Sequence, residues 1–164
     1  MNQGCFYFLK DQYFIDFPDK SLMKNKETVN GVAHDRPCFY SFYSSETGIY
    51  WLIPFSSRLE KYKELYNQKM TKYGKCDTIL FGEVLGHEKA FLIQNICPVI
   101  PKYISSEYLD SVAKIPVKID FKLEKEITKK AKKVLALVRK GRNFMVFPDI
   151  LSIEKGLLVM LEEE

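Results

Sequence analysis

The sequence lacks any long apolar run. None of its apolar stretches is long enough to cross a bilayer, so we expect no membrane-spanning helix and no membrane partner. The first ten residues have neither the basic start nor the long apolar core of a secretory signal, and Asp11 follows them directly. A cytoplasmic protein is therefore the expectation.

Signatures of metal sites and of common catalytic families are also missing. The four cysteines form no C-x-x-C pair and have no histidine at the spacing of a zinc ligand. The sequences G-x-x-x-x-G-K-[ST], H-E-x-x-H and G-x-S-x-G do not occur. The sequence thus predicts no metal, no cofactor and no disulfide, with most of the thiols packed as small buried hydrophobes.

The composition is that of a folded protein with local concentrations of positive charge. Apolar residues make up 46% of the 164 residues and charged residues 28%, which suits a single domain over residues 1–164. The formal net charge of +4 does not by itself indicate nucleic-acid binding. Basic residues nevertheless gather near residue 25, over 58–75 and over 125–142. Such groups favour a phosphate-bearing partner, although lysine-rich helix faces are commonly just solvated.

Aromatic and β-branched runs predict strands in the first hundred residues. Short strands are expected over 5–10 and 14–17, followed by a loop over 19–31. Strands over 38–43 and 49–55 surround a short turn and should form a hairpin. A second hairpin is expected from 79–85 and 89–93, with Gly86 and His87 in its turn.

Helices are predicted mainly in the second half of the chain. One runs over 58–73, with Ser57 as its cap, Glu60 completing a capping box and Gly74 at its end. Others are expected over 105–112, 120–140 and 148–161. This order predicts an α+β fold, a strongly bent antiparallel sheet resembling a partial barrel, with packed helices that include a long one near the C-terminus.

Two short polar segments flank the first predicted hairpin. His34, Asp35 and Arg36 precede its first strand, and residues 56–58 (Ser-Ser-Arg) follow its second strand. If the strands pair, both segments lie at the same open end, next to the N–H groups of a helix start. Guanidinium groups, hydroxyls and free N–H donors together suit a phosphate.

This set of groups fits RNA cleavage. The 2′-hydroxyl must lose a proton and attack the adjacent phosphorus, and preorganised donors can stabilise the charge that develops. His34, or a lysine, is the candidate general base or acid. Structural interpretations remain open: His34 could pair with Asp35, Ser56 and Ser57 could simply cap the helix, and Arg58 could be solvated. His87 receives no role.

Residues 36–40 (Arg-Pro-Cys-Phe-Tyr) and 51–58 (Trp-Leu-Ile-Pro-Phe-Ser-Ser-Arg) resemble the paired strand motifs of the MazF/PemK-like toxin fold. Within that fold, the order of elements along nearly the whole chain is most similar to the ToxN/AbiQ/CptN group of type III toxin–antitoxin systems. The resemblance implies a sequence-selective, metal-independent endoribonuclease toxin that leaves 2′,3′-cyclic phosphate ends. It also implies inhibition by a small repeated pseudoknot RNA in a closed protein–RNA hetero-oligomer.

The resemblance also assigns candidate site residues. The family's basic residue before the second motif strand falls on Arg36, its Ser/Thr-Ser pair on Ser56 and Ser57, and its following basic residue on Arg58 or, less directly, on Lys61. Some relatives have lysines at positions where this chain has arginines, so the general base stays open, with His34 favoured. The expected RNA-binding residues are Lys24, Lys26, Asp35, Lys61, Lys63, Lys129, Lys133, Arg139, Lys140 and Arg142.

Two other functions fit the same residues. A non-catalytic RNA-binding module of this fold would need the basic surface but not the clustered Arg36, Ser56, Ser57 and Arg58. A basic protein-interaction domain would bind an acidic protein instead of RNA, and its RNA affinity would lack the steep salt dependence of phosphate contacts.

Overall fold

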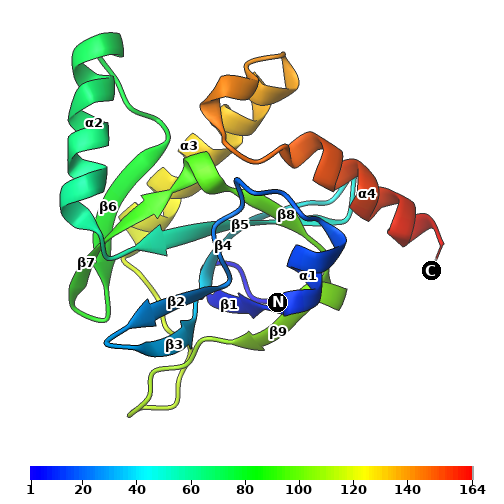
Figure 1. Ribbon diagram of the computed structural model, residues 1–164, viewed down its shortest axis with the longest axis horizontal. Coiled ribbons are helices and arrows are strands. Elements are labelled where there is room, and N and C mark those ends of the chain that lie inside the picture. Colours follow the sequence, from blue (N-terminus) through cyan, green and yellow to red (C-terminus); the bar gives the residue numbers. More distant parts are fainter. Residues whose placement is uncertain (164) are drawn as a thin grey trace.

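The computed structural model describes residues 1–163, which form a mostly antiparallel sheet, a separate small hairpin and four α-helices (Figure 1). The strands are β1 (Phe6–Leu9), β2 (Lys26–Val29), β3 (Val32–Asp35), β4 (Cys38–Ser44), β5 (Ile49–Ser56), β6 (Ile79–Val84), β7 (His87–Leu92), β8 (Cys97–Val99) and β9 (Ile104–Glu107). The helices are α1 (Asp11–Asp16), α2 (Leu59–Tyr73), α3 (Phe121–Arg139) and α4 (Ile150–Glu162).

The sheet is organised around β5. Its strand order is β6-β7-β5-β4-β1-β9, with β8 pairing β5 beside this path. β4 follows one edge of β5, whereas the other edge pairs first with β8 and then, at Phe55 and Ser56, with β7. Register shifts within β4 and β1 add local bends. These antiparallel pairings and the packed helices confirm the predicted α+β class.

The three longer helices cover different parts of the sheet. α3 packs against β4, α4 against β8, and α2 against β7 (Figure 1). Asp120 caps α3 by accepting hydrogen bonds from the main-chain N–H groups of Lys122 and Leu123. The predicted apolar stripe of α3 is buried, including Ile127 and Val134, and its lysines lie largely on the exposed side. The predictions of α2, α3 and α4 are therefore confirmed.

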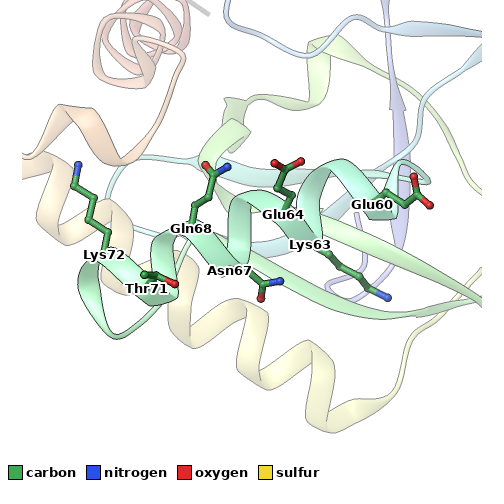
Figure 2. A pocket seen from close by; sticks show the side chains of 7 residues that line it. All are labelled: Glu60, Lys63, Glu64, Asn67, Gln68, Thr71 and Lys72. Atoms are coloured by element: carbon green, nitrogen blue, oxygen red, sulfur yellow. The ribbon is translucent and has the colours of Figure 1, made fainter.

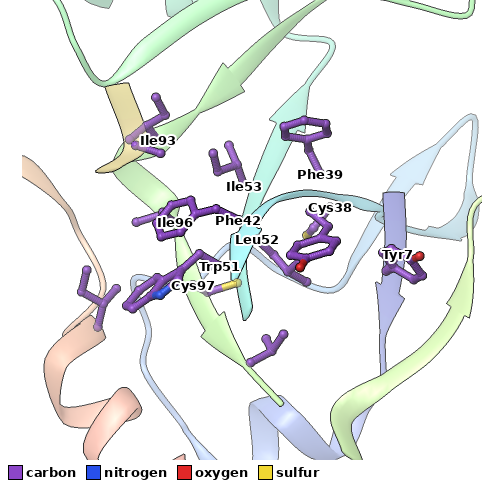
Figure 3. Packing of buried hydrophobic residues seen from close by; sticks show 14 of the residues in the cluster. Tyr7, Cys38, Phe39, Phe42, Trp51, Leu52, Ile53, Ile93, Ile96 and Cys97 are labelled. Atoms are coloured by element: carbon purple, nitrogen blue, oxygen red, sulfur yellow. The ribbon is translucent and has the colours of Figure 1, made fainter. Parts of the chain in front are cut away.

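The core is richest in aromatic side chains where β4 and β5 pair (Figure 3). Trp51 is fully buried, its ring stacks on Phe42 at a centroid distance of 6.1 Å, and its indole N–H donates to Ser44 Oγ. Phe39 and Ile53 face each other across the same two strands and are fully buried. Each such side chain contributes roughly 2–3 kcal/mol by leaving water, so this hairpin is fixed in one register.

All four cysteines are buried free thiols. Cys5, Cys38 and Cys97 belong to this core, and Cys76, the one with polar neighbours in the sequence, lies in a smaller cluster with Tyr62 and Ile79. Burial raises the pKa of Cys38 to about 12, so this thiol stays protonated and acts as a packing group.

The strand predicted over 14–17 is wrong, because this segment belongs to the short helix α1. The main-chain N–H of Phe17 donates to the Tyr13 carbonyl, four residues back. The two rings lie 5.5 Å apart and pack on the same side of the helix. Six residues are too few for a clear helical period, so the aromatic content alone suggested a strand.

The loop predicted over 19–31 is wrong in its second half, where β2 begins a small hairpin with β3. Asn30 and Gly31 form its two-residue turn, and both have positive φ angles, 51° and 79°. Asn-Gly between β-favouring residues is a strong hairpin signal. The polar, lysine-rich composition of the segment had outweighed it.

Three smaller predictions also differ from the structure. The helical piece expected over 105–112 is wrong, since this segment begins within β9. β9 pairs with β1 and provides hydrogen-bond partners for the edge of β1 that does not face β4. Ser57 is not the cap of α2, because Arg58 occupies that position and no side chain caps it. The turn between β6 and β7 consists of Leu85 and Gly86, both with positive φ, so His87 begins β7.

One ion pair joins the last two long helices. Arg139 Nη2 of α3 lies 2.6 Å from Glu154 Oε1 of α4, and the Glu154 side chain is only 6% exposed. The guanidinium also lies 6.0 Å from the Trp51 ring centroid. Arg139 therefore neutralises a buried carboxylate, which is a structural use of a residue predicted to bind RNA.

We predict that Arg139→Ala lowers the free energy of unfolding by roughly 2 kcal/mol, because it leaves the Glu154 carboxylate buried without a counter-charge. The exposed neighbour Lys140 provides the control, and Lys140→Ala should change stability by less than about 0.5 kcal/mol. Urea unfolding measures both. Equal, small losses in the two variants would contradict the structural role of Arg139.

Candidate functional site

The register of the β4–β5 hairpin brings two distant segments together. Cys38 pairs with Pro54, so the residues before Cys38 and after Pro54 leave the hairpin at the same end. β7 joins this end through the pairing of Ser56 with Ala90. A pocket of about 470 Å³ opens there, here called the Arg36 pocket. Its polar lining includes Glu27, His34, Asp35, Arg36, Ser57, His87, Lys89 and Tyr108.

Part of the predicted catalytic cluster lines this pocket. The structure brings His34, Asp35, Arg36 and Ser57 together. Ser56 is buried, and its hydroxyl oxygen accepts a hydrogen bond from the main-chain N–H of Arg58 at 3.2 Å. The Arg58 side chain is exposed at the start of α2 and does not line the pocket. Ser56 thus supports the local backbone, while Ser57 faces the pocket.

Arg36 is held at the pocket wall with an unused donor. Its side chain is 14% exposed, and Nη2 lies 3.3 Å from Glu27 Oε2. Its Nη1 contacts the sulfur of Met23 at 3.9 Å. Among residues 1–163, the buried Nε has no hydrogen-bond partner. An unsatisfied donor is costly in a folded protein, and a guanidinium in this situation suits an acceptor-rich ligand such as phosphate.

Ser57 and Lys89 form the second polar element of the pocket. Lys89 Nζ donates to Ser57 Oγ at 2.6 Å, which joins β7 to the chain leaving β5. The serine oxygen is therefore occupied as an acceptor, and its hydroxyl hydrogen remains available to another group. The pair places a positive charge and a hydroxyl donor at one point.

Both histidines of the chain line the same pocket. His34 lies on β3, opposite Glu27 of β2, and is exposed. His87 is the first residue of β7, opposite Val84, and is also exposed. His87 and Lys89 were not predicted as site residues from the sequence, because only the pairing of β7 with the end of β5 brings them here. The local signal available was the Leu85-Gly86 turn, which sets where β7 begins.

The predicted RNA-binding residues are spread over several surfaces. Four of them make ion pairs on the protein: Lys26 with Asp11, Lys63 with Glu88, Lys133 with Asp77, and Arg139 with Glu154. Among residues 1–163, the exposed ones without such a pair are Lys24, Lys61, Lys129, Lys140 and Arg142. Asp35 lies on β3 opposite Lys26. The pairs of Lys26 and Lys63 are exposed on both sides and contribute little to stability, so these two lysines can exchange a carboxylate for a phosphate.

A hollow of about 750 Å³ runs along the exposed face of α2 and does not form a site (Figure 2). Glu60, Lys63, Glu64 and Asn67 diverge from the helix instead of pointing toward one another. In the part of the chain that the structure describes, no three His, Cys, Asp or Glu side chains gather where they could hold a metal ion. No helix in residues 1–163 is long and apolar enough to cross a membrane.

Comparisons with known proteins find a relative by structure and none by sequence. No family model matches the sequence. A search of curated proteins also finds no match. Among solved structures, the chain is similar to AbiQ, a lactococcal anti-phage endoribonuclease belonging to the type III toxin–antitoxin system. The TM-score is 0.69 at 13% identity, and the match covers 99% of this chain and 100% of AbiQ. The chain therefore has the AbiQ fold from end to end, as the sequence resemblance implied.

Proposed function

We propose that this protein is an endoribonuclease that cuts RNA in the Arg36 pocket without a metal ion. One observation carries the proposal: a single pocket collects a guanidinium, an ammonium group bound to a serine hydroxyl, and two imidazoles. Further support comes from AbiQ, an endoribonuclease that shares the fold over its full length.

The proposed reaction is a transesterification within the RNA strand. A general base takes the proton of the 2′-hydroxyl, and the 2′-oxygen forms a bond to the adjacent phosphorus. The bond from phosphorus to the 5′-oxygen breaks, and that oxygen takes a proton from a general acid. The products are a 2′,3′-cyclic phosphate and a 5′-hydroxyl, with no net consumption of water.

The lining residues supply the groups that this reaction needs. The Arg36 guanidinium and Lys89 Nζ donate to the non-bridging phosphate oxygens, and these bonds strengthen as negative charge develops in the transition state. Ser57 adds its hydroxyl donor to the same phosphate. His34 and His87 provide the base and the acid, because imidazole can both accept and donate a proton near neutral pH. Arg58, at the N-cap position of α2, contacts a flanking phosphate outside the pocket.

The proposal extends to the control of this activity in the cytoplasm. We expect an RNA antitoxin built from small pseudoknot repeats, held with the protein in a closed assembly. Support comes from the type III toxin–antitoxin system to which AbiQ belongs and from exposed basic residues well beyond the pocket, such as Lys129 and Lys140.

Cleavage of a long RNA in EDTA tests the activity. The wild-type protein should make discrete cuts with 2′,3′-cyclic phosphate ends, which mass spectrometry of the fragments identifies. Ser57→Ala and Lys89→Met should each slow cleavage by roughly 10²–10³-fold, because each removes a donor to the transition state. Arg36→Met should abolish detectable cleavage while changing the free energy of unfolding by only about 1 kcal/mol, since it also removes an unsatisfied buried donor.

The matched control is Ser45→Ala, at an exposed serine in the turn between β4 and β5. This variant should cut RNA at the wild-type rate. RNA binding without cuts by the wild-type protein would favour a binding module, and loss of cleavage in EDTA would contradict the metal-independent reaction. Full activity in both Ser57→Ala and Lys89→Met would mean that cleavage takes place outside this pocket.

Native mass spectrometry tests the antitoxin. Protein isolated from cells that carry its gene together with the flanking DNA should contain a short RNA at a fixed protein-to-RNA ratio. Raising the salt concentration should release it steeply, because phosphate contacts release counterions. Isolation of an acidic protein partner in place of RNA would contradict this part of the proposal.

A further inference from the structure

A second pocket lies away from the Arg36 pocket and has a different character. It encloses about 310 Å³ and is here called the Tyr73 pocket. Its walls come from the end of α2, the segment leading into β6 and the connection between α3 and α4. The residues that carry the argument are Lys69, Tyr73, Asp77, Thr78, Arg142 and Phe144.

Two aromatic side chains stand exposed at this pocket. Tyr73 is 57% exposed and Phe144 is 76% exposed, although both line the hollow. Residues Asn143–Met145 form a short 3₁₀ turn that carries Phe144. A large exposed aromatic ring forgoes the stability that burial would give. Rings in this situation serve as platforms on which unpaired bases stack.

The pocket also holds a partly buried positive charge. Lys69 Nζ donates to Thr78 Oγ1 at 2.7 Å and to Gln94 Oε1 at 3.2 Å. Both partners are neutral, and no carboxylate of residues 1–163 lies within ion-pair distance of it. Burial lowers the pKa of Lys69. The ammonium has a third donor to offer, and an anion bound there would offset its desolvation.

The remaining charges at this pocket also favour an anion. Lys75 and Arg142 line it, and both are exposed. Among the described residues that line the pocket, the one acidic side chain is Asp77, whose carboxylate lies 2.7 Å from Lys133 Nζ and is therefore neutralised. Aromatic rings beside an excess of positive charge match a base joined to a phosphate.

The helix α2 connects the two pockets. It begins two residues after Ser57, which lines the Arg36 pocket, and its last residue is Tyr73 (Figure 1). Fifteen helical residues span about 22 Å. A single RNA strand cut in the Arg36 pocket can thus reach the Tyr73 pocket several nucleotides from the cut.

We propose that the Tyr73 pocket binds one nucleotide of the RNA substrate, with its base stacked on Tyr73 and Phe144 and its phosphate held by Lys69 and Arg142. This inference rests on the proposed ribonuclease function and deepens it. It gives the protein a way to select RNA by a nucleotide remote from the bond that is cut.

The test measures the affinity of the full-length protein for a fluorescein-labelled, single-stranded 2′-O-methyl RNA of about 15 nucleotides, which cannot be cut. Phe144→Ala and Tyr73→Ala should each weaken binding about 10-fold, as expected for the loss of one stacking platform. Lys69→Gln, which keeps a donor but removes the charge, should weaken binding and reduce its salt dependence. All of the altered side chains lie outside the main core, and thermal unfolding checks that each variant folds.

The matched control is Phe147→Ala, since Phe147 is 58% exposed and close in sequence but does not line the pocket. Its affinity should stay within about 2-fold of wild type.

The outcomes separate the two proposals. If Phe144→Ala and Tyr73→Ala bind the long RNA like Phe147→Ala, this inference fails while the cleavage proposal stands. If the wild-type protein binds no RNA at all, both proposals fail.

Discussion

The pairing of β4 with β5 is the interaction on which the rest of the structure depends. It joins Cys38 to Pro54 at one end and Ser44 to Ile49 at the other, and it buries Trp51 completely. A slip of one residue would turn every core side chain to the opposite face, so burial holds the register. That register sets where Arg36 and Ser57 leave the hairpin. The free edge of β5 then receives β7, which adds His87 and Lys89 to the pocket.

Two arginines illustrate how the same side chain serves stability or chemistry. Arg139 lies 2.6 Å from the buried Glu154 carboxylate and over the Trp51 ring. Its charge is therefore paired and its guanidinium group packs on an aromatic ring, both within the fold. Arg36 is less exposed than Arg139, yet its Nε has no partner in the described chain. The Arg36 guanidinium is therefore not fully used by the fold, although it lines the pocket. Lys69 at the Tyr73 pocket is a similar case, because its ammonium group donates to the neutral side chains of Thr78 and Gln94.

Local patterns predicted the elements that have a strong period or a clear end. The stripe of α3, the end of α2 at Gly74 and the central hairpin were all accessible from the sequence, as was the meeting of His34 and Arg36 with Ser57. Two failures were local, because α1 is too short to show a period and the polar composition of residues 26–29 outweighed the signal of the Asn30-Gly31 turn. The other failures were set by pairing between distant segments. β9 forms because the edge of β1 needs partners, and Lys89 reaches Ser57 only through the β5–β7 pairing. No local signal carries such information.

The most direct test of the central claim uses the two histidines, because both belong to the Arg36 pocket and the chain has no others. The imidazole signals of the protein are recorded by NMR while an uncleavable 2′-O-methyl RNA is added. If RNA is bound for cleavage in this pocket, both signals should shift and saturate together with binding. RNA that binds with equal affinity while both histidine signals stay in place would contradict the account.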